Sequence, residues 1–158
     1  GLDSTVGDNS THIIDEHDTT LGSELITGFT NGTGYPLSDF TTSGRDVSGT
    51  VSSAFGGVAS NSFTVATGDV YKVTFNLTHN SGDVLRVFIA TGADGASASR
   101  SDTNLQTTTS GSTTVYLTMI TAGTSYLQLG TGSGGHSIDF STTDVSCKKV
   151  SGNYGVLL

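Results

Sequence analysis

Residues 63–77 read Phe-Thr-Val-Ala-Thr-Gly-Asp-Val-Tyr-Lys-Val-Thr-Phe-Asn-Leu, two runs of alternating side chains around one glycine. Phe63 and Val65 share a face in the first run, and every second residue from Tyr71 to Leu77 is apolar in the second. A side-chain period of two is typical of a half-buried β-strand. The residues between the runs, 67–69, are Thr-Gly-Asp, which favour a tight turn. The stretch therefore predicts a β-hairpin.

The same period recurs along the chain between glycine-rich turns, and the 158 residues contain 22 glycines but a single proline. Short strands at regular spacing are typical of a sandwich or jelly roll. We expect an all-β fold, a single β-sandwich or jelly roll of about eight strands, with negligible helix. The expected strands are 23–29, 46–52, 60–66, 69–78, 83–90, 112–119, 124–130 and 137–148.

The apolar residues at alternating positions of these strands should form the core between two sheets. Cys147 alternates with Val145 and is the only cysteine, so we expect a small buried side chain and no disulfide within the chain. The predicted core consists of Leu25, Phe63, Val65, Tyr71, Val73, Phe75, Leu77, Leu85, Val87, Ile89, Val115, Leu117, Tyr126, Leu127, Leu129, Ile138, Phe140 and Val145.

The two ends of the chain differ from the sandwich, which we place at residues 21–150. Residues 1–20 are rich in acids, and Ile13 and Ile14 form their only apolar pair. Such a segment buries too little apolar surface to fold alone. We expect either an extended arm that contacts a neighbouring surface through Ile13 and Ile14, or a frayed terminus. Residues 151–158 form a C-terminal tail.

The charge balance excludes some classes of partner. Fourteen acids against six bases give a formal net charge of −8. Such a chain is repelled by phosphate backbones and by anionic lipids, so we expect no binding to nucleic acid or to a membrane. No pair of acids or nucleophile–histidine pair is marked out by its position in the sequence, so we expect a protein without enzymatic activity.

Four segments together resemble one family. The segments Leu21–Thr27 (LGSELIT), Phe63–Val73 (FTVATGDVYKV), Gly111–Thr118 (GSTTVYLT) and Phe140–Lys148 (FSTTDVSCK) occur in the order seen in small jelly-roll domains similar to carbohydrate-binding modules. Such domains are common in structural proteins of tailed bacteriophages.

The resemblance implies two functions. The first is a virion structural protein of a tailed phage, a capsid decoration (cement) protein on the virion surface. It would form a homotrimer and contact the major capsid protein or other virion proteins. The alternative is a glycan-binding receptor-recognition domain of a tail fibre or spike. Neither role implies a cofactor.

The candidate binding residues are few because the chain has no tryptophan. Recognition of a sugar by stacking needs exposed aromatic rings. Tyr35 and Phe40 flank a loop that contains Pro36, where they would form a glycan-binding rim or close the end of the sandwich. The resemblance also implies that carboxylates near the two ends of the domain hold a structural calcium, and here these are Glu24 and Asp144. Calcium requires several oxygen ligands at once.

Overall fold

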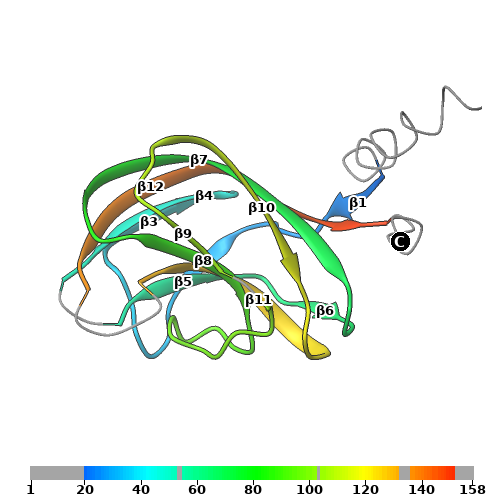
Figure 1. Ribbon diagram of the computed structural model, residues 1–158. Helices are drawn as coiled ribbons and strands as arrows, with labels where there is room; N and C mark the ends of the chain where they lie inside the picture. The colour runs from blue at the N-terminus through cyan, green and yellow to red at the C-terminus, as the bar shows by residue number, and fades with distance from the viewer. Residues whose placement is uncertain (1–19, 53–54, 103, 132–135, 152–158) are drawn as a thin grey trace, which may run out of the picture.

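The computed structural model describes residues 20–52, 55–102, 104–131 and 136–151. In these residues the chain forms twelve strands and no helix, and the strands lie in two layers (Figure 1). Every strand pairing between them is antiparallel. The predicted fold class, an all-β sandwich, is confirmed. The described residues include no helix long and apolar enough to cross a membrane.

The two sheets, which we name A and B, contain six described strands each. Sheet A has the order β10 (Gly111–Thr118), β7 (Val70–Gly82), β12 (Ile138–Val150), β4 (Asp46–Val51) and β3 (Ser38–Ser43), and β1 (Leu21–Glu24) pairs with β12. Sheet B has the order β2 (Phe29–Asn31), β5 (Gly57–Ser60), β11 (Gly123–Gly130), β8 (Leu85–Ala90) and β9 (Leu105–Thr107), and β6 (Phe63–Val65) pairs with β11.

The predicted hairpin at residues 63–77 is wrong in its pairing. Both strands and the turn are present, with Gly68 at a φ of +87°. However, β6 pairs with β11 in sheet B, whereas β7 lies between β10 and β12 in sheet A. The turn therefore connects the two sheets, and the rings of Phe63 and Tyr71 face each other with centroids 5.8 Å apart. A period of two identifies a strand and its buried face but does not identify its neighbour.

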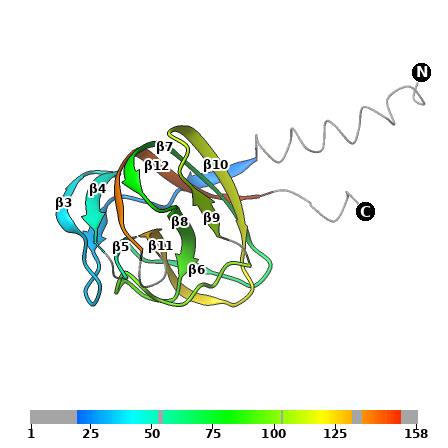
Figure 2. The ribbon, with the colours of Figure 1, turned by 60° about the vertical axis from the view of Figure 1, so that its left-hand side comes forward.

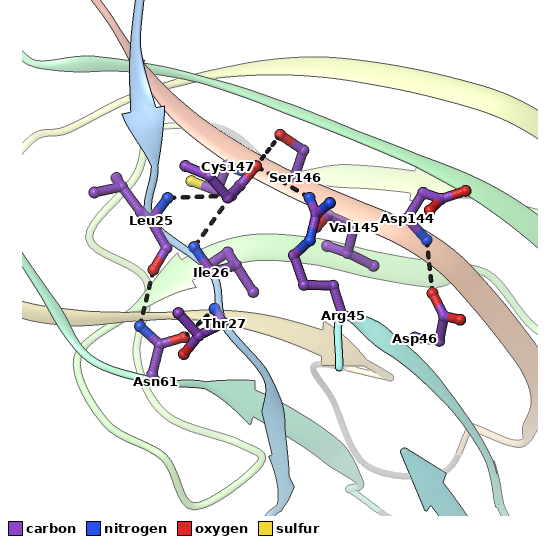
Figure 3. Close-up of polar contacts among 11 residues, drawn as sticks. Leu25, Ile26, Thr27, Arg45, Asp46, Asn61, Asp144, Val145, Ser146 and Cys147 are labelled. Atoms are coloured by element: carbon purple, nitrogen blue, oxygen red, sulfur yellow. Dashed lines mark hydrogen bonds and ion pairs between the residues drawn. The ribbon is translucent and has the colours of Figure 1, made fainter. Parts of the chain in front are cut away.

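One expected strand is interrupted because the chain changes direction within it. Residues 25–28 cross from sheet A to sheet B, so the expected strand 23–29 is split into β1 and β2. Asn61, which lies between β5 and β6, bonds this crossing segment: its amide nitrogen donates to the Leu25 carbonyl and its amide oxygen accepts from the Thr27 amide, both at 2.8 Å (Figure 3). Strand β5 was not expected and shares only Ser60 with the expected strand 60–66, whose remainder contains β6. The edge strands β3 and β9 were not expected either, since they contain few apolar residues.

The core lies between the sheets and contains most of the predicted residues. Leu25, Phe63, Val115 and Tyr126 are only half-buried, and the other predicted core side chains are buried. Cys147 is buried with a free thiol, as expected, and burial raises its pKa. Buried residues that the prediction lacked include Ile26, Phe29, Leu37, Val47, Val51, Val58 and Met119.

The first and last described residues lie side by side. The Ser151 amide donates to the Thr20 carbonyl at 2.8 Å, just beyond the pairing of Leu21 with Val150. Figures 1 and 2 show β1 and the end of β12 extending together from one end of the sandwich.

Candidate functional site

A loop covers the outer face of sheet B. Residues 91–102 follow β8 and lie beneath the lower layer in Figure 1; we name them the covering loop. Leu127 and Leu129 of β11 point into the core, so Gln128 between them points outward, yet it is completely buried. Its side-chain nitrogen donates to the Gly95 carbonyl at 3.1 Å. The loop is therefore packed on the sheet.

Close backbone packing joins the covering loop to the β2–β3 connection. Gly95 has a φ of +93°, and a Cβ there would lie 2.9 Å from the Gly57 carbonyl oxygen. A larger residue would be excluded both by its φ and by this contact. The Tyr35 amide donates to the Asp94 carbonyl at 2.7 Å, and the Tyr35 carbonyl accepts from the Gly57 amide at 3.0 Å. Tyr35 is thus fixed through both of its backbone groups.

The carboxylate of Asp94 braces the covering loop from within. It accepts hydrogen bonds from the Ser97 hydroxyl at 2.6 Å and from the Ala96 amide at 2.8 Å. These two donors, the hydroxyl first, lower the pKa of Asp94. A carboxylate held in its ionised form by its own loop stabilises that loop's conformation.

Two aromatic rings are exposed beside this loop. Tyr35 is 43% exposed and Phe55 is 41% exposed, and their ring centroids lie 5.4 Å apart at an interplanar angle of 56°. The predicted partner of Tyr35, Phe40, is instead half-buried and packs against the core. The ring of Tyr35 thus contacts that of Phe55. The two residues are twenty positions apart, and no pattern in the sequence indicates this contact.

Hollows lie on the outer face of sheet B on both sides of the covering loop. The first, about 370 Å³, is lined by residues that include Thr27, Phe29, Thr30, Ser60, Ala93 and Tyr126. The second, about 240 Å³, lies on the β8 side, and Arg86 and Phe88 contribute to its lining. We name these the β2 hollow and the β8 hollow. A third, about 300 Å³, lies on sheet A and is lined mainly by hydroxyl-bearing residues of β3, β4 and β12.

The carboxylate of Glu24 is surrounded by donors of the chain. One oxygen accepts from the amides of Leu25, Ile26 and Cys147, at 3.1, 3.1 and 2.8 Å. The other accepts from the Ser146 hydroxyl and forms an ion pair with Arg45 at 3.1 Å. The carboxylate thus ties the crossing segment to β12.

The second expected calcium ligand, Asp144, has another role. It lies in a β-bulge of β12 with a φ of +54°, and its amide donates to the Asp46 carboxylate at 2.9 Å. Figure 3 shows its side chain pointing away from the Arg45 guanidinium. The described residues contain no group of three or more His, Cys, Asp or Glu side chains that could hold a metal ion. The Glu24 environment does not fit calcium, because Arg45 already supplies the positive charge.

We therefore expect the melting temperature to be the same in a buffer with calcium as in one with EDTA, because a cation at Glu24 would have to displace the Arg45 guanidinium. Differential scanning calorimetry measures both. A rise of several degrees in calcium would show that Glu24, Asp144 or other oxygens of the chain do bind the ion.

The remaining predicted contact residues, Ile13 and Ile14, lie outside the described residues, and so does nearly all of the arm at 1–20. The expected homotrimer and virion partners depend on contacts between chains, and the structure contains one chain. They stay predictions.

Comparison with known proteins finds the fold again. No protein-family model matches the chain, and no curated protein matches its sequence. Among solved structures, a CBM4 carbohydrate-binding module is 19% identical, with 77% of this chain and 94% of that one covered at a TM-score of 0.55. The N-terminal cellulose-binding domain of β-1,4-glucanase C from Cellulomonas fimi is 18% identical, with 76% and 87% covered and a TM-score of 0.44. At 19% identity the likeness to the CBM4 module is one of fold: the chain has the jelly-roll sandwich seen in that module.

Proposed function

We propose that this chain binds carbohydrate without acting on it, at the end of sheet B where Tyr35 and Phe55 are exposed. The observation that carries the proposal is this pair of rings, each more than two-fifths exposed and in contact with the other. Exposed aromatic rings on a rigid support are what the C–H faces of sugar rings stack upon. The resemblance of the fold to carbohydrate-binding modules supports the same assignment.

The β2 hollow adds a mostly apolar wall with a few polar groups on the same sheet. Ala93 lines it, and the next residue, Asp94, accepts the hydrogen bond that fixes Tyr35. Thr27 and Thr30 bring hydroxyl groups to its wall and Tyr126 brings a phenol. Small-molecule sites combine apolar walls with a few such polar groups, which fix the orientation of the ligand.

The chemistry of the nearest carboxylate supports binding without reaction. A glycosidase needs an acid that can donate a proton to the leaving oxygen and a second carboxylate across the cleft. The Asp94 carboxylate is engaged by Ser97 and Ala96 within its own loop, and its pKa is lowered. A group tuned in this direction is a poor general acid near neutral pH.

Replacing Tyr35 or Phe55 by alanine should weaken glycan binding about tenfold, about 1.4 kcal/mol, because each change removes one stacking surface. A glycan array first identifies a ligand, and titration calorimetry then compares the variants. Tyr116→Ala is the matched control, since Tyr116 is 41% exposed but lies on β10 of the other sheet. Equal losses in all three variants, or a blank array, would contradict the proposal.

Glycan binding is also the function that the tail-fibre or spike alternative requires. The finer expectations, a virion surface location, a capsid decoration role and a homotrimer, rest on the sequence resemblance alone. Light scattering on the purified protein tests the trimer, and imaging of purified particles tests the location.

A further inference from the structure

The β8 hollow contains Arg86, a charged side chain that forms no ion pair within the described residues. The Nε atom of Arg86 is buried and has no hydrogen-bond partner among the described residues. The other guanidinium groups are engaged: Arg45 binds the Glu24 carboxylate and the Val145 carbonyl, and Arg100 binds the Thr121 hydroxyl and two carbonyl oxygens. No ion pair of Arg86 occurs within the described ranges. Arg86 as a whole is half-buried, so a ligand in the hollow can reach it, and a buried donor atom without a partner is costly and points to such a ligand.

We propose that the β8 hollow takes the carboxylate of an acidic sugar, a uronate residue of a glycan, through Arg86. This inference rests on the proposed function and names a class of ligand for it. A guanidinium presents a planar fork of N–H donors that matches a carboxylate in two parallel hydrogen bonds. In a chain of net charge −8, an anion requires such a local cation to bind at all.

The walls of the hollow fit a sugar ring better than a bare inorganic anion. Phe88, only 6% exposed, and the methyl groups of Ala96 and Ala98 form its apolar side. Asn104 brings an amide that can bond a ring hydroxyl. A volume of about 240 Å³ lies below the usual range for extended ligands, so we infer that a single ring is held there.

The β8 hollow lies at the same end of sheet B as the two exposed rings. Gly57, Gly130 and Arg86 are opposite one another on β5, β11 and β8, so two strand spacings, about 10 Å, separate Gly57 from Arg86. Gly57 is bonded to the Tyr35 carbonyl. A short glycan that crosses the covering loop can therefore reach both the rings and the guanidinium.

The test compares one acidic oligosaccharide with its neutral form. Trigalacturonate and its methyl ester are titrated into the full chain, and the Nε–H signal of Arg86 is followed by NMR. We expect the acid, and not the ester, to shift this signal, and added salt to weaken the binding. Arg86→Gln should weaken the affinity for the acid at least tenfold and leave the affinity for the ester unchanged. Arg86→Lys should recover part of the lost affinity, since it restores the positive charge but not the planar pair of N–H donors.

The controls separate this inference from the proposed function. Lys72→Gln removes one positive charge from sheet A and should leave both affinities unchanged, and melting curves establish that each variant is folded. Equal binding of acid and ester, or full acid affinity in Arg86→Gln, would overturn the uronate inference while carbohydrate binding stands. If neither these nor the neutral glycans of the array bind, the proposed function itself is wrong.

Discussion

Replacing Phe75 by alanine should lower the free energy of unfolding by about 3–5 kcal/mol, the usual cost of removing a buried aromatic side chain. Phe75 is 3% exposed and points into the core from β7, which is paired on both sides by β10 and β12. Neighbouring side chains held by two paired strands cannot collapse fully into the space that the ring leaves. Urea titration measures the change, provided that the dependence of the unfolding free energy on urea concentration is the same in both proteins.

Asn76→Ala is the control for this change, because Asn76 is the next residue of β7 and is exposed on the other face of sheet A. It should alter stability by no more than about 0.5 kcal/mol. A loss below about 1 kcal/mol for Phe75→Ala would mean that the ring does not fill the core.

Glu24→Ala should lower the free energy of unfolding by about 3 kcal/mol, because it leaves several donors without their acceptor at once. The amides of Ile26 and Cys147 and the guanidinium of Arg45 all donate to this carboxylate. The side chain is 25% exposed, so water reaches part of the site and limits the loss. Chemical denaturation of the purified variant measures it.

Two further variants separate the hydrogen bonds from the charge. Glu24→Gln retains one acceptor oxygen and should cost less than Glu24→Ala. Arg45→Met removes only the ion pair and its bond to the Val145 carbonyl, and should also cost less. If Glu24→Ala proves as mild as Arg45→Met, the amide bonds of the crossing segment contribute little.

The sequence identified most of the strands but not their partners. Period-two runs such as 70–77 reveal a buried face, because one half of the side chains must leave water. Strand pairing depends on contacts between distant segments. The sequence of the turn at 67–69 therefore fits a hairpin between neighbouring strands and a connection between two sheets equally well. The edge strands β3 and β9 have little to bury and left no pattern.

The candidate site was predicted in part. Tyr35 could be found by elimination, since it is an aromatic outside the strand pattern. Phe55 becomes its neighbour only through the packing of three loops near Gly57. The pattern of β8 places Arg86 outward, which normally means water. Arg86 is half-buried with its Nε atom buried, and residues of the covering loop line the same hollow, a tertiary contact that no local pattern contains.

The hydrogen bond between Thr20 and Ser151 brings the two ends of the sandwich together, which suits the sandwich to insertion into another protein. Since its entry and exit points are one hydrogen bond apart, the domain can be inserted into a surface loop of an unrelated host with no stretching of either chain. The Tyr35 carbonyl is bonded to Gly57, which pairs with Gly130 at one end of β11, whereas the other end of β11 pairs with β6, next to the start of β7 and its partner Lys149. A domain inserted at this junction would be attached to the host at one end of the sandwich. The two exposed rings of the proposed glycan site would then point away from the host.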